Sequence, residues 1–144
     1  MLSIVTFKPE HLAALRLQPW QAAAQHSMNE AHGRELAAQT GLAYTALDDG
    51  VPLACAGVIE IWRGRAYAWS YLSAGAFKQF KAVHRAVLEF LVLAAERWPR
   101  IEMAIDVDHV AAKRWAFHLG FALEGVARKW TPEGRDAEIW ARVT

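Results

Sequence analysis

Residues 109–125 read HVAAKRWAFHLGFALEG, and this stretch decides the order of the last elements of the chain. Its first part has the apolar spacing of an amphipathic helix. Gly120 ends that helix, since glycine is common just past a helix C-terminus. Phe121 then opens a strand at once. The stretch therefore predicts a helix that is followed directly by a strand.

The segments on both sides of this unit predict further strands and one long helix. A strand over 121–131, a turn at 132–134 and a final strand over 135–143 end the chain. Upstream, residues 77–98 carry apolar side chains at helical spacing, and Pro99 ends that helix. Residues 101–107 form a short apolar strand. Because a long helix connects this strand to the strand before it, we expect the two strands to be parallel neighbours.

The N-terminal half predicts an antiparallel meander that follows short helices. A strand over 3–8 precedes a helix from Pro9 to about residue 17, and residues 21–39 suit one or two short helices near the surface. Strands follow over 42–48, 51–62 and 65–72. The turns at 48–50 and 63–64 contain Asp49, Gly50 and Gly64, and such residues supply the positive φ angles that tight hairpins need.

Length and composition describe a single globular domain over residues 1–144, with 54% apolar residues. The formal net charge of +1 provides no overall field for nucleic acid or an anionic membrane, so neither partner is expected. No segment has the roughly 20 apolar residues that span a bilayer, and no basic leader opens the chain. The single Cys55 is expected in the core of a protein in a reducing interior. Together these features predict a cytoplasmic protein.

The element order and the quoted helix resemble the GNAT acyltransferase superfamily over nearly the whole chain. That family often shows Asn-x-x-Ala, then a Tyr four residues before a Gly-Phe pair, then Glu-Gly. The positions that match are Ala112, Gly120, Phe121, Glu124 and Gly125, whereas His109 replaces the Asn and Ala116 replaces the Tyr. The resemblance implies an α/β (α+β) fold, with a mixed and mostly antiparallel central sheet flanked by helices.

The resemblance also implies a site for acetyl-coenzyme A at the start of the long helix. GNAT enzymes hold the pyrophosphate there on an Arg/Gln-x-x-Gly-x-Gly/Ala loop, where free amides and the helix dipole attract phosphate. The matching positions are Gln79, Phe80, Lys81, Ala82, Val83 and His84, and Arg85 opens the typical continuation. Ala82 and His84 replace the two glycines. Lys78, Lys81 and Arg85 share one side of the helix, as an anion site or as a solvated face.

In GNAT enzymes the strand before this loop splays away from its parallel neighbour, and the thioester and pantetheine bond to backbone in the gap. Those contacts carry over to the backbone of Leu72 and Ala74. In GNAT enzymes the Tyr that Ala116 replaces here donates a proton to the departing thiolate. Tyr71 and His109 are therefore the candidate proton donors, with Tyr67 and His118 as further substitutes. Glu60 is the candidate general base, with Asp106 and Asp108 as alternatives. The histidines have no metal-ligand spacing, so no metal is expected.

Two functions remain open at this stage. One is an acetyl-CoA-dependent N-acetyltransferase that acts on a small or protein amine. The other is a catalytically inactive GNAT-like protein with a binding or structural role. The chain is also similar to the small GNAT-like proteins of tailed phages, including the small internal virion protein of T7-like phages, through its length, its layout and the helix start FKQFK at 77–81. That resemblance implies a bacterial host, with virion components as partners. A homodimer is the other assembly that remains open.

Overall fold

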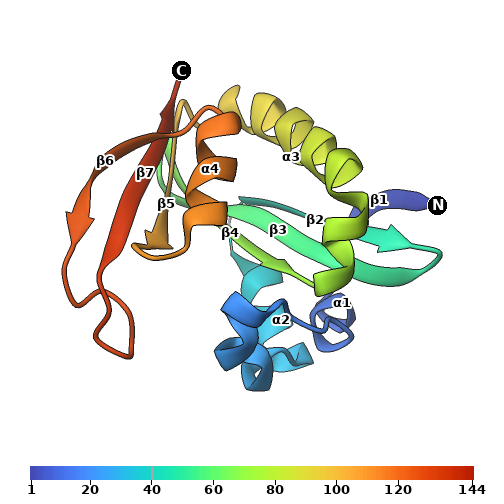
Figure 1. The fold of residues 1–144 in the computed structure, drawn as a ribbon. Coiled ribbons are helices and arrows are strands. Elements are labelled where there is room, and N and C mark those ends of the chain that lie inside the picture. The colour runs from blue at the N-terminus through green and yellow to red at the C-terminus, as the bar shows by residue number, and fades with distance from the viewer. Residues whose placement is uncertain (40) are drawn as a thin grey trace.

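The computed structural model describes residues 1–39 and 41–144, which form one seven-stranded sheet flanked by helices (Figure 1). The strand order is β1-β2-β3-β4-β5-β7-β6, and every neighbouring pair is antiparallel except β4 and β5. This confirms the predicted mostly antiparallel α+β fold. The strands are β1 (Leu2–Thr6), β2 (Gly41–Asp48), β3 (Val51–Trp62), β4 (Arg65–Leu72), β5 (Arg100–Asp106), β6 (Ala122–Ala127) and β7 (Ala137–Val143).

The meander of β2, β3 and β4 forms as the sequence predicts. Asp49 and Gly50 have φ angles of 48° and 84°, so two successive positive φ values make the tight turn between β2 and β3. Gly64 has a φ angle of 87° in the turn between β3 and β4. The turns therefore set the pairing beside them, and the register then shifts once in each hairpin, at Ala46/Leu47 and at Glu60/Trp62.

The N-terminal helices are shorter than the sequence suggests. The helix expected from Pro9 to about residue 17 ends earlier, as α1 (Pro9–Ala13). A 3-10 helix, η1 (Pro19–Ser27), and α2 (Glu30–Ala38) then account for the one or two short helices predicted over 21–39. The Asn29 side chain caps α2 by accepting from the His32 N–H at 2.9 Å. A Cβ on Gly33 would lie 2.7 Å from the Pro9 backbone, so α1 and α2 touch backbone to backbone.

The long helix begins later than its apolar pattern implies. Residues 77–79 belong to a 3-10 turn, η2 (Ala74–Gln79), and the helix proper is α3 (Phe80–Ala95). At the other end of the chain, the strands predicted over 121–131 and 135–143 shorten to β6 and β7. The Thr131–Gly134 turn forms, with Gly134 donating to the Thr131 carbonyl at 2.8 Å, but the residues flanking it leave the ladder.

Two helical layers cover the two faces of the sheet, above and below it in Figure 1. α3 and α4 (Val110–His118) cover one face, over a core that includes Val58, Leu91 and Trp98. α1, η1 and α2 lie against the other face, over Leu12 and Cys55. Both of those side chains are fully buried. Within the residues described, no helix is long and apolar enough to cross a membrane.

Cys55 is a buried, inert thiol, in agreement with the expectation of a core residue. Desolvation raises its pKa to about 11, although a hydrogen bond with Thr45 opposes that change. Thiolate, the reactive form, is therefore scarce at neutral pH. The cysteine contributes packing rather than chemistry.

Candidate functional site

The parallel strands β4 and β5 pair only at their beginnings and then separate. Their register contains three residue pairs, the last of which joins Tyr67 to Glu102. β4 continues to Leu72 and β5 to Asp106 without further pairing to each other, while β5 pairs with β7 along its whole length. We call the opening between residues 68–72 of β4 and residues 103–106 of β5 the fork. Backbone groups on the β4 side of the fork need partners other than a strand.

Gln21 supplies partners for the fork edge of β4. Its Nε2 donates to the Ser70 carbonyl at 2.8 Å, and its Oε1 accepts from the Leu72 N–H at 2.9 Å. The backbone N–H of Gln18 donates to the Leu72 carbonyl at 2.8 Å. Leu72, one of the two backbone positions predicted to bind the thioester or pantetheine, is thus engaged by η1 and the residue before it. Ala74, the other position, is exposed at the start of η2.

η1 also reaches the opposite side of the fork through Trp20. The indole of Trp20 stacks on the His109 ring, with centroids 4.5 Å apart and planes 10° apart. His109 occupies the N-cap position of α4, three residues after the end of β5. Burial lowers the pKa of His109, and the charge of Asp106 opposes this shift. The η1 segment therefore contacts the end of β4 through Gln21 and contacts His109, which lies beyond the end of β5, through Trp20.

The predicted phosphate loop lies at the start of α3, where two of its basic side chains remain free for solvent. Lys81 and Arg85 are exposed, and Ala82 between them is exposed as well. Gln79 precedes the helix, and a hydrogen bond from its side chain is the leading cause of the lowered pKa of Asp48. Val83 instead faces inward and is 2% exposed. The loop thus presents cations on one side and core residues on the other.

His84, which replaces the second glycine of the loop, is held by α4. Its Nδ1 accepts a hydrogen bond from the Trp115 indole N–H at 3.0 Å. Phe80 packs edge-on against Trp115, with centroids 5.3 Å apart. The imidazole therefore faces α4 in a fixed orientation. Sequence reasoning missed this role of Trp115, because a tryptophan on a helix next to the core is ordinarily a packing residue.

The position that corresponds to the GNAT tyrosine in the resemblance holds no group able to transfer a proton. Ala116 is 1% exposed and belongs to the core beneath α4. Tyr67 instead stands at the last paired position of β4, where the fork begins. Burial raises the pKa of Tyr67, while a hydrogen bond from the Ala104 backbone partly offsets this. A phenol in that environment stays protonated at neutral pH and can donate a proton.

Tyr71, a predicted catalytic residue, packs on the sheet face that α1 and α2 cover. Its hydroxyl lies 3.3 Å from His32 Nε2 on α2, and its ring packs near Trp69. Burial is the leading cause of its raised pKa. The side chain therefore points into the layer between α2 and the sheet, one residue from the fork edge at Leu72.

Glu60, the predicted general base, lies beside the beginning of β4, where β4 pairs with β5; we call this the closed end of β4. It pairs in register with Ala66, and its carboxylate accepts from the Trp98 indole N–H at 2.7 Å. Arg97 Nη2 is 3.5 Å from the same oxygen. The carboxylate thus binds the end of α3 to the sheet, and the structure does not bring Glu60 together with His109.

The two aspartates that follow β5 are tied to one arginine. Arg135 donates to both carboxylate oxygens of Asp106, at 2.6 and 2.8 Å, and to Asp108 at 2.6 Å. The hydrogen bond from Arg135 is the main reason that the pKa of Asp106 falls to about 2. A carboxylate so weakly basic is a poor proton acceptor at neutral pH. Asp106 and Asp108 therefore have a structural role, because they hold Arg135 against the end of β5.

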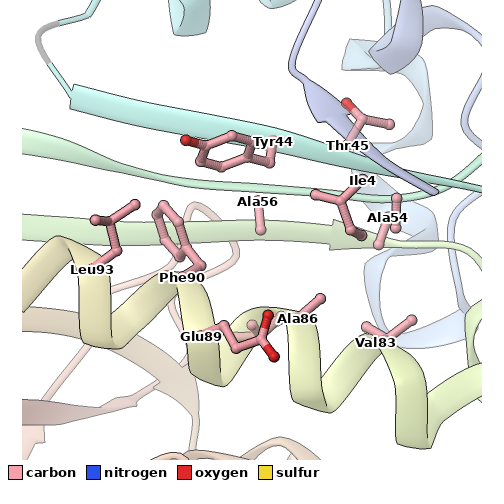
Figure 2. A pocket seen from close by; sticks show the side chains of 12 residues that line it. Ile4, Tyr44, Thr45, Ala54, Ala56, Val83, Ala86, Glu89, Phe90 and Leu93 are labelled. Atoms are coloured by element: carbon pink, nitrogen blue, oxygen red, sulfur yellow. The ribbon is translucent and has the colours of Figure 1, made fainter.

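An apolar groove lies away from the fork, between α3 and strands β1 to β3 (Figure 2). Small side chains on facing elements, including Ala54, Ala56 and Ala86, leave a space of about 250 Å³. Of the residues predicted for the cofactor, Val83 lines this groove. A second cavity lies beside α2 and β2 and includes none of them. Among residues 1–39 and 41–144, no group of three or more His, Cys, Asp or Glu side chains could hold a metal ion.

Comparison with known proteins identifies the fold. No protein-family model matches the chain. No curated protein matches it in sequence. Among solved structures, Ard1 from Thermoplasma volcanium aligns with a TM-score of 0.81 at 15% identity, over 99% of this chain and 97% of that one.

Two further structures give the same result. The ribosomal-protein-S18-alanine N-acetyltransferase from Escherichia coli aligns with a TM-score of 0.73 at 17% identity, covering 99% of this chain and 94% of that one. An acetyltransferase of the GNAT family from Streptococcus pneumoniae aligns with a TM-score of 0.72 at 13% identity, over 99% of both chains. At these identities the likeness concerns architecture, and the chain has the fold of the GNAT-family acetyltransferases.

Proposed function

We propose that the protein is an acetyl-CoA-dependent N-acetyltransferase acting on a small or protein amine. The fork carries this proposal, because β4 and β5 part after three residue pairs and leave outward-facing backbone on β4. The neighbours in fold are described as acetyltransferases, which supports the same reading. The proposal treats residues 1–144 as one catalytic domain and acetyl-CoA as the acyl donor.

The β4 side of the fork suits the pantetheine arm of coenzyme A. Ser70 offers a carbonyl and Leu72 an N–H, both directed at the open edge, and both already bind an amide in the Gln21 side chain. The Gln21 amide uses the same donor and acceptor that a pantetheine amide would need, and this supports the proposed position of the arm. Lys81 and Arg85, together with Lys78, would attract the diphosphate at the start of α3.

Two residues at the borders of the fork, His109 and Tyr67, have pKa shifts that support roles in proton transfer. Acetyl-CoA supplies an activated carbonyl. As the acceptor nitrogen bonds to that carbon and the carbon–sulfur bond breaks, His109, neutral because burial lowers its pKa, accepts the proton from nitrogen. Tyr67 donates its phenolic proton to the departing thiolate, so the products are an acetylated amine and free coenzyme A. Of the other predicted catalytic residues, Tyr71 packs between α2 and the sheet, and Glu60 lies at the opposite end of β4, where its carboxylate accepts from the Trp98 indole.

A non-catalytic role is the second candidate, and the region between α3 and α4 favours it. Ala116 leaves no acid at the family's tyrosine position, and the His84 to Trp115 hydrogen bond puts an aromatic pair where the glycine loop should be open. In this alternative the domain serves as a binding or structural protein, as the phage resemblance implies, in the virion or on a target in the bacterial cytoplasm. A homodimer and virion components are the partners that belong to it.

Calorimetric titration with acetyl-CoA separates the two candidates. The enzyme proposal expects binding by the wild type, weaker binding by Lys81→Ala because one phosphate partner is lost, and tighter binding by His84→Gly. Release of free coenzyme A is then followed with a panel of amines. Tyr67→Phe should retain binding and lower turnover by about 100-fold. Absence of binding by the wild type, by His84→Gly and by Gln21→Ala, which frees the edge of β4, would exclude the transferase and leave the non-catalytic role.

A further inference from the structure

We propose that η1 is an autoinhibitory strap, in which Gln21 occupies the edge of β4 that the pantetheine arm needs and must leave before acetyl-CoA can bind. The inference rests on the proposed function, since it concerns access to the same site. Three contacts from η1 carry it: two from the Gln21 amide and one from the Trp20 ring. The Gln18 backbone, just before η1, holds the Leu72 carbonyl at the fixed end.

The Gln21 amide copies the hydrogen bonds of a missing parallel strand. In a parallel ladder, one residue donates to the carbonyl of residue i and accepts from the N–H of residue i+2 on its neighbour. Gln21 does this with Ser70 and Leu72, at 2.8 and 2.9 Å. The side chain therefore continues the ladder that β5 abandons after Glu102. An extended chain of amides, such as pantetheine, competes for the same donor and acceptor.

Trp20 extends the contact across the fork. Its stack on His109 joins η1 to the N-terminus of α4, while Gln21 joins η1 to β4. The segment thus bridges the two sides of the fork near their ends. Because His109 is also the base assigned above, the same stack covers a group that the reaction requires. Closure of the strap accordingly blocks both the donor arm and the proton acceptor.

The strap buries none of its own residues and lies between two buried ends, and Gln25 ties its second half to Leu15 and Leu17. None of its nine residues is buried, and 3-10 hydrogen bonds are less well aligned than those of an α-helix. Trp20 remains 52% exposed. The flanking residues Gln18 and Met28 are 8% and 6% exposed, so the ends stay fixed while the arc between them can move. Segments with few buried contacts open at low free-energy cost.

The charges around the fork do not oppose an anionic ligand once the strap leaves. Asp106 and Asp108 are both paired with Arg135. Lys81 and Arg85 stand exposed at the start of α3. When Gln21 leaves, a pantetheine amide can replace its side-chain amide on β4. The phosphates of the same ligand then meet Lys81 and Arg85.

Binding of acetyl-CoA to four proteins tests the strap: the wild type, Gln21→Ala, Trp20→Ala and Gln39→Ala. Gln21→Ala should bind about tenfold more tightly, because two competing hydrogen bonds are gone and the open state is more populated. Trp20→Ala should bind several-fold more tightly. Gln39 is an exposed glutamine outside the strap, so Gln39→Ala should match the wild type.

A second ligand locates the effect on the pantetheine arm. Adenosine 3′-phosphate 5′-diphosphate carries the charged end of coenzyme A but does not reach β4, so its affinity should be the same for the wild type and Gln21→Ala. Equal acetyl-CoA affinities of these two proteins would overturn the strap and leave the transferase standing. No acetyl-CoA binding by any of the four proteins would overturn the transferase and the strap with it.

Discussion

The two ends of β4 are held in different ways. At its beginning, β4 pairs with β5, Ala66 and Ile101 are at most 1% exposed, and Arg65 donates to the Glu102 carboxylate. At its end, the backbone of Ser70 and Leu72 is satisfied by the Gln21 side chain. The first end gains stability from a strand, a core and paired charges. The second relies on a segment with no buried residue of its own.

This contrast shows how one strand can serve both as scaffold and as a site. Backbone groups that pair with a neighbouring strand are not available to a ligand, whereas groups that pair with a side chain can exchange that partner. The buried end fixes the position of β4 in the sheet. The end at the fork can then change partners without loss of the fold.

The largest effect is expected from Trp98 at the closed end. This side chain is fully buried, and its indole N–H bonds to Glu60. Trp98→Ala should lower the free energy of unfolding by about 3–5 kcal/mol, because a large cavity replaces the ring. Denaturant unfolding measures the loss. Trp130, which is 55% exposed, provides the matched control, and a comparable loss in Trp130→Ala would contradict the assigned role of burial.

Glu102 tests the charged part of the closed end. The hydrogen bond from Arg65 is the leading cause of its lowered pKa, so its stabilising contribution is complete above the unfolded pKa of 4.5 and disappears as pH falls through the lower folded value. Glu102→Gln should cost about 2 kcal/mol at neutral pH. The difference in free energy of unfolding between the wild type and Glu102→Gln should be smaller at about pH 3 than at pH 7. If that difference does not change with pH, the Glu102 side chain stabilises the fold through packing and not through its charge.

Gln25 tests how η1 is attached at the fork end. Its side chain accepts from the Leu17 N–H at 2.7 Å and donates to the Leu15 carbonyl at 2.8 Å. Gln25→Ala should lower the free energy of unfolding by about 1–2 kcal/mol. Hydrogen exchange at the Leu72 amide should accelerate more than at Val58 in the core. Equal acceleration at both amides would mean that η1 and the core open together.

The smallest effect is expected at the β5 side of the fork. The Arg135 hydrogen bond lowers the pKa of Asp106 to about 2 from an unfolded value of 3.8. Stability from this pair is therefore present above about pH 4 and is lost as pH falls toward 2. Asp106→Asn should cost about 1 kcal/mol at neutral pH, since both partners are partly solvated. The difference from wild type should vanish in acid, and its persistence there would exclude the charge as its source.

The sequence predicted the sheet because its signals are local. Asp49, Gly50 and Gly64 mark the hairpins, and the crossover rule makes β4 and β5 parallel. Element ends were less predictable. The apolar pattern begins at Phe77, yet 3-10 geometry persists to Gln79, because apolar spacing over one turn does not distinguish the two helix types.

The candidate site was less visible in the sequence. The fork forms because the backbone of β4 has no strand partner beyond Tyr67, and no particular side chain in the sequence marks the place where that pairing ends. Gln21 belongs to a stretch with weak apolar periodicity, where a glutamine that bonds to a distant strand looks like any surface glutamine. His84 could be aligned to the phosphate loop, but its bond to Trp115 depends on how α3 and α4 pack.

The close approach of Gly33 to Pro9 determines how η1 can move. Because α1 and α2 touch through their backbones, the helices before and after η1 are packed against each other while η1 itself lies between them in sequence. Opening therefore needs no rotation of one part of the protein against another. Opening of a hydrogen-bonded strap is a local unfolding event, which takes microseconds to seconds, and typical turnover times fall within that range. The strap can therefore set the pace of the reaction as well as the fraction of time for which the site is open.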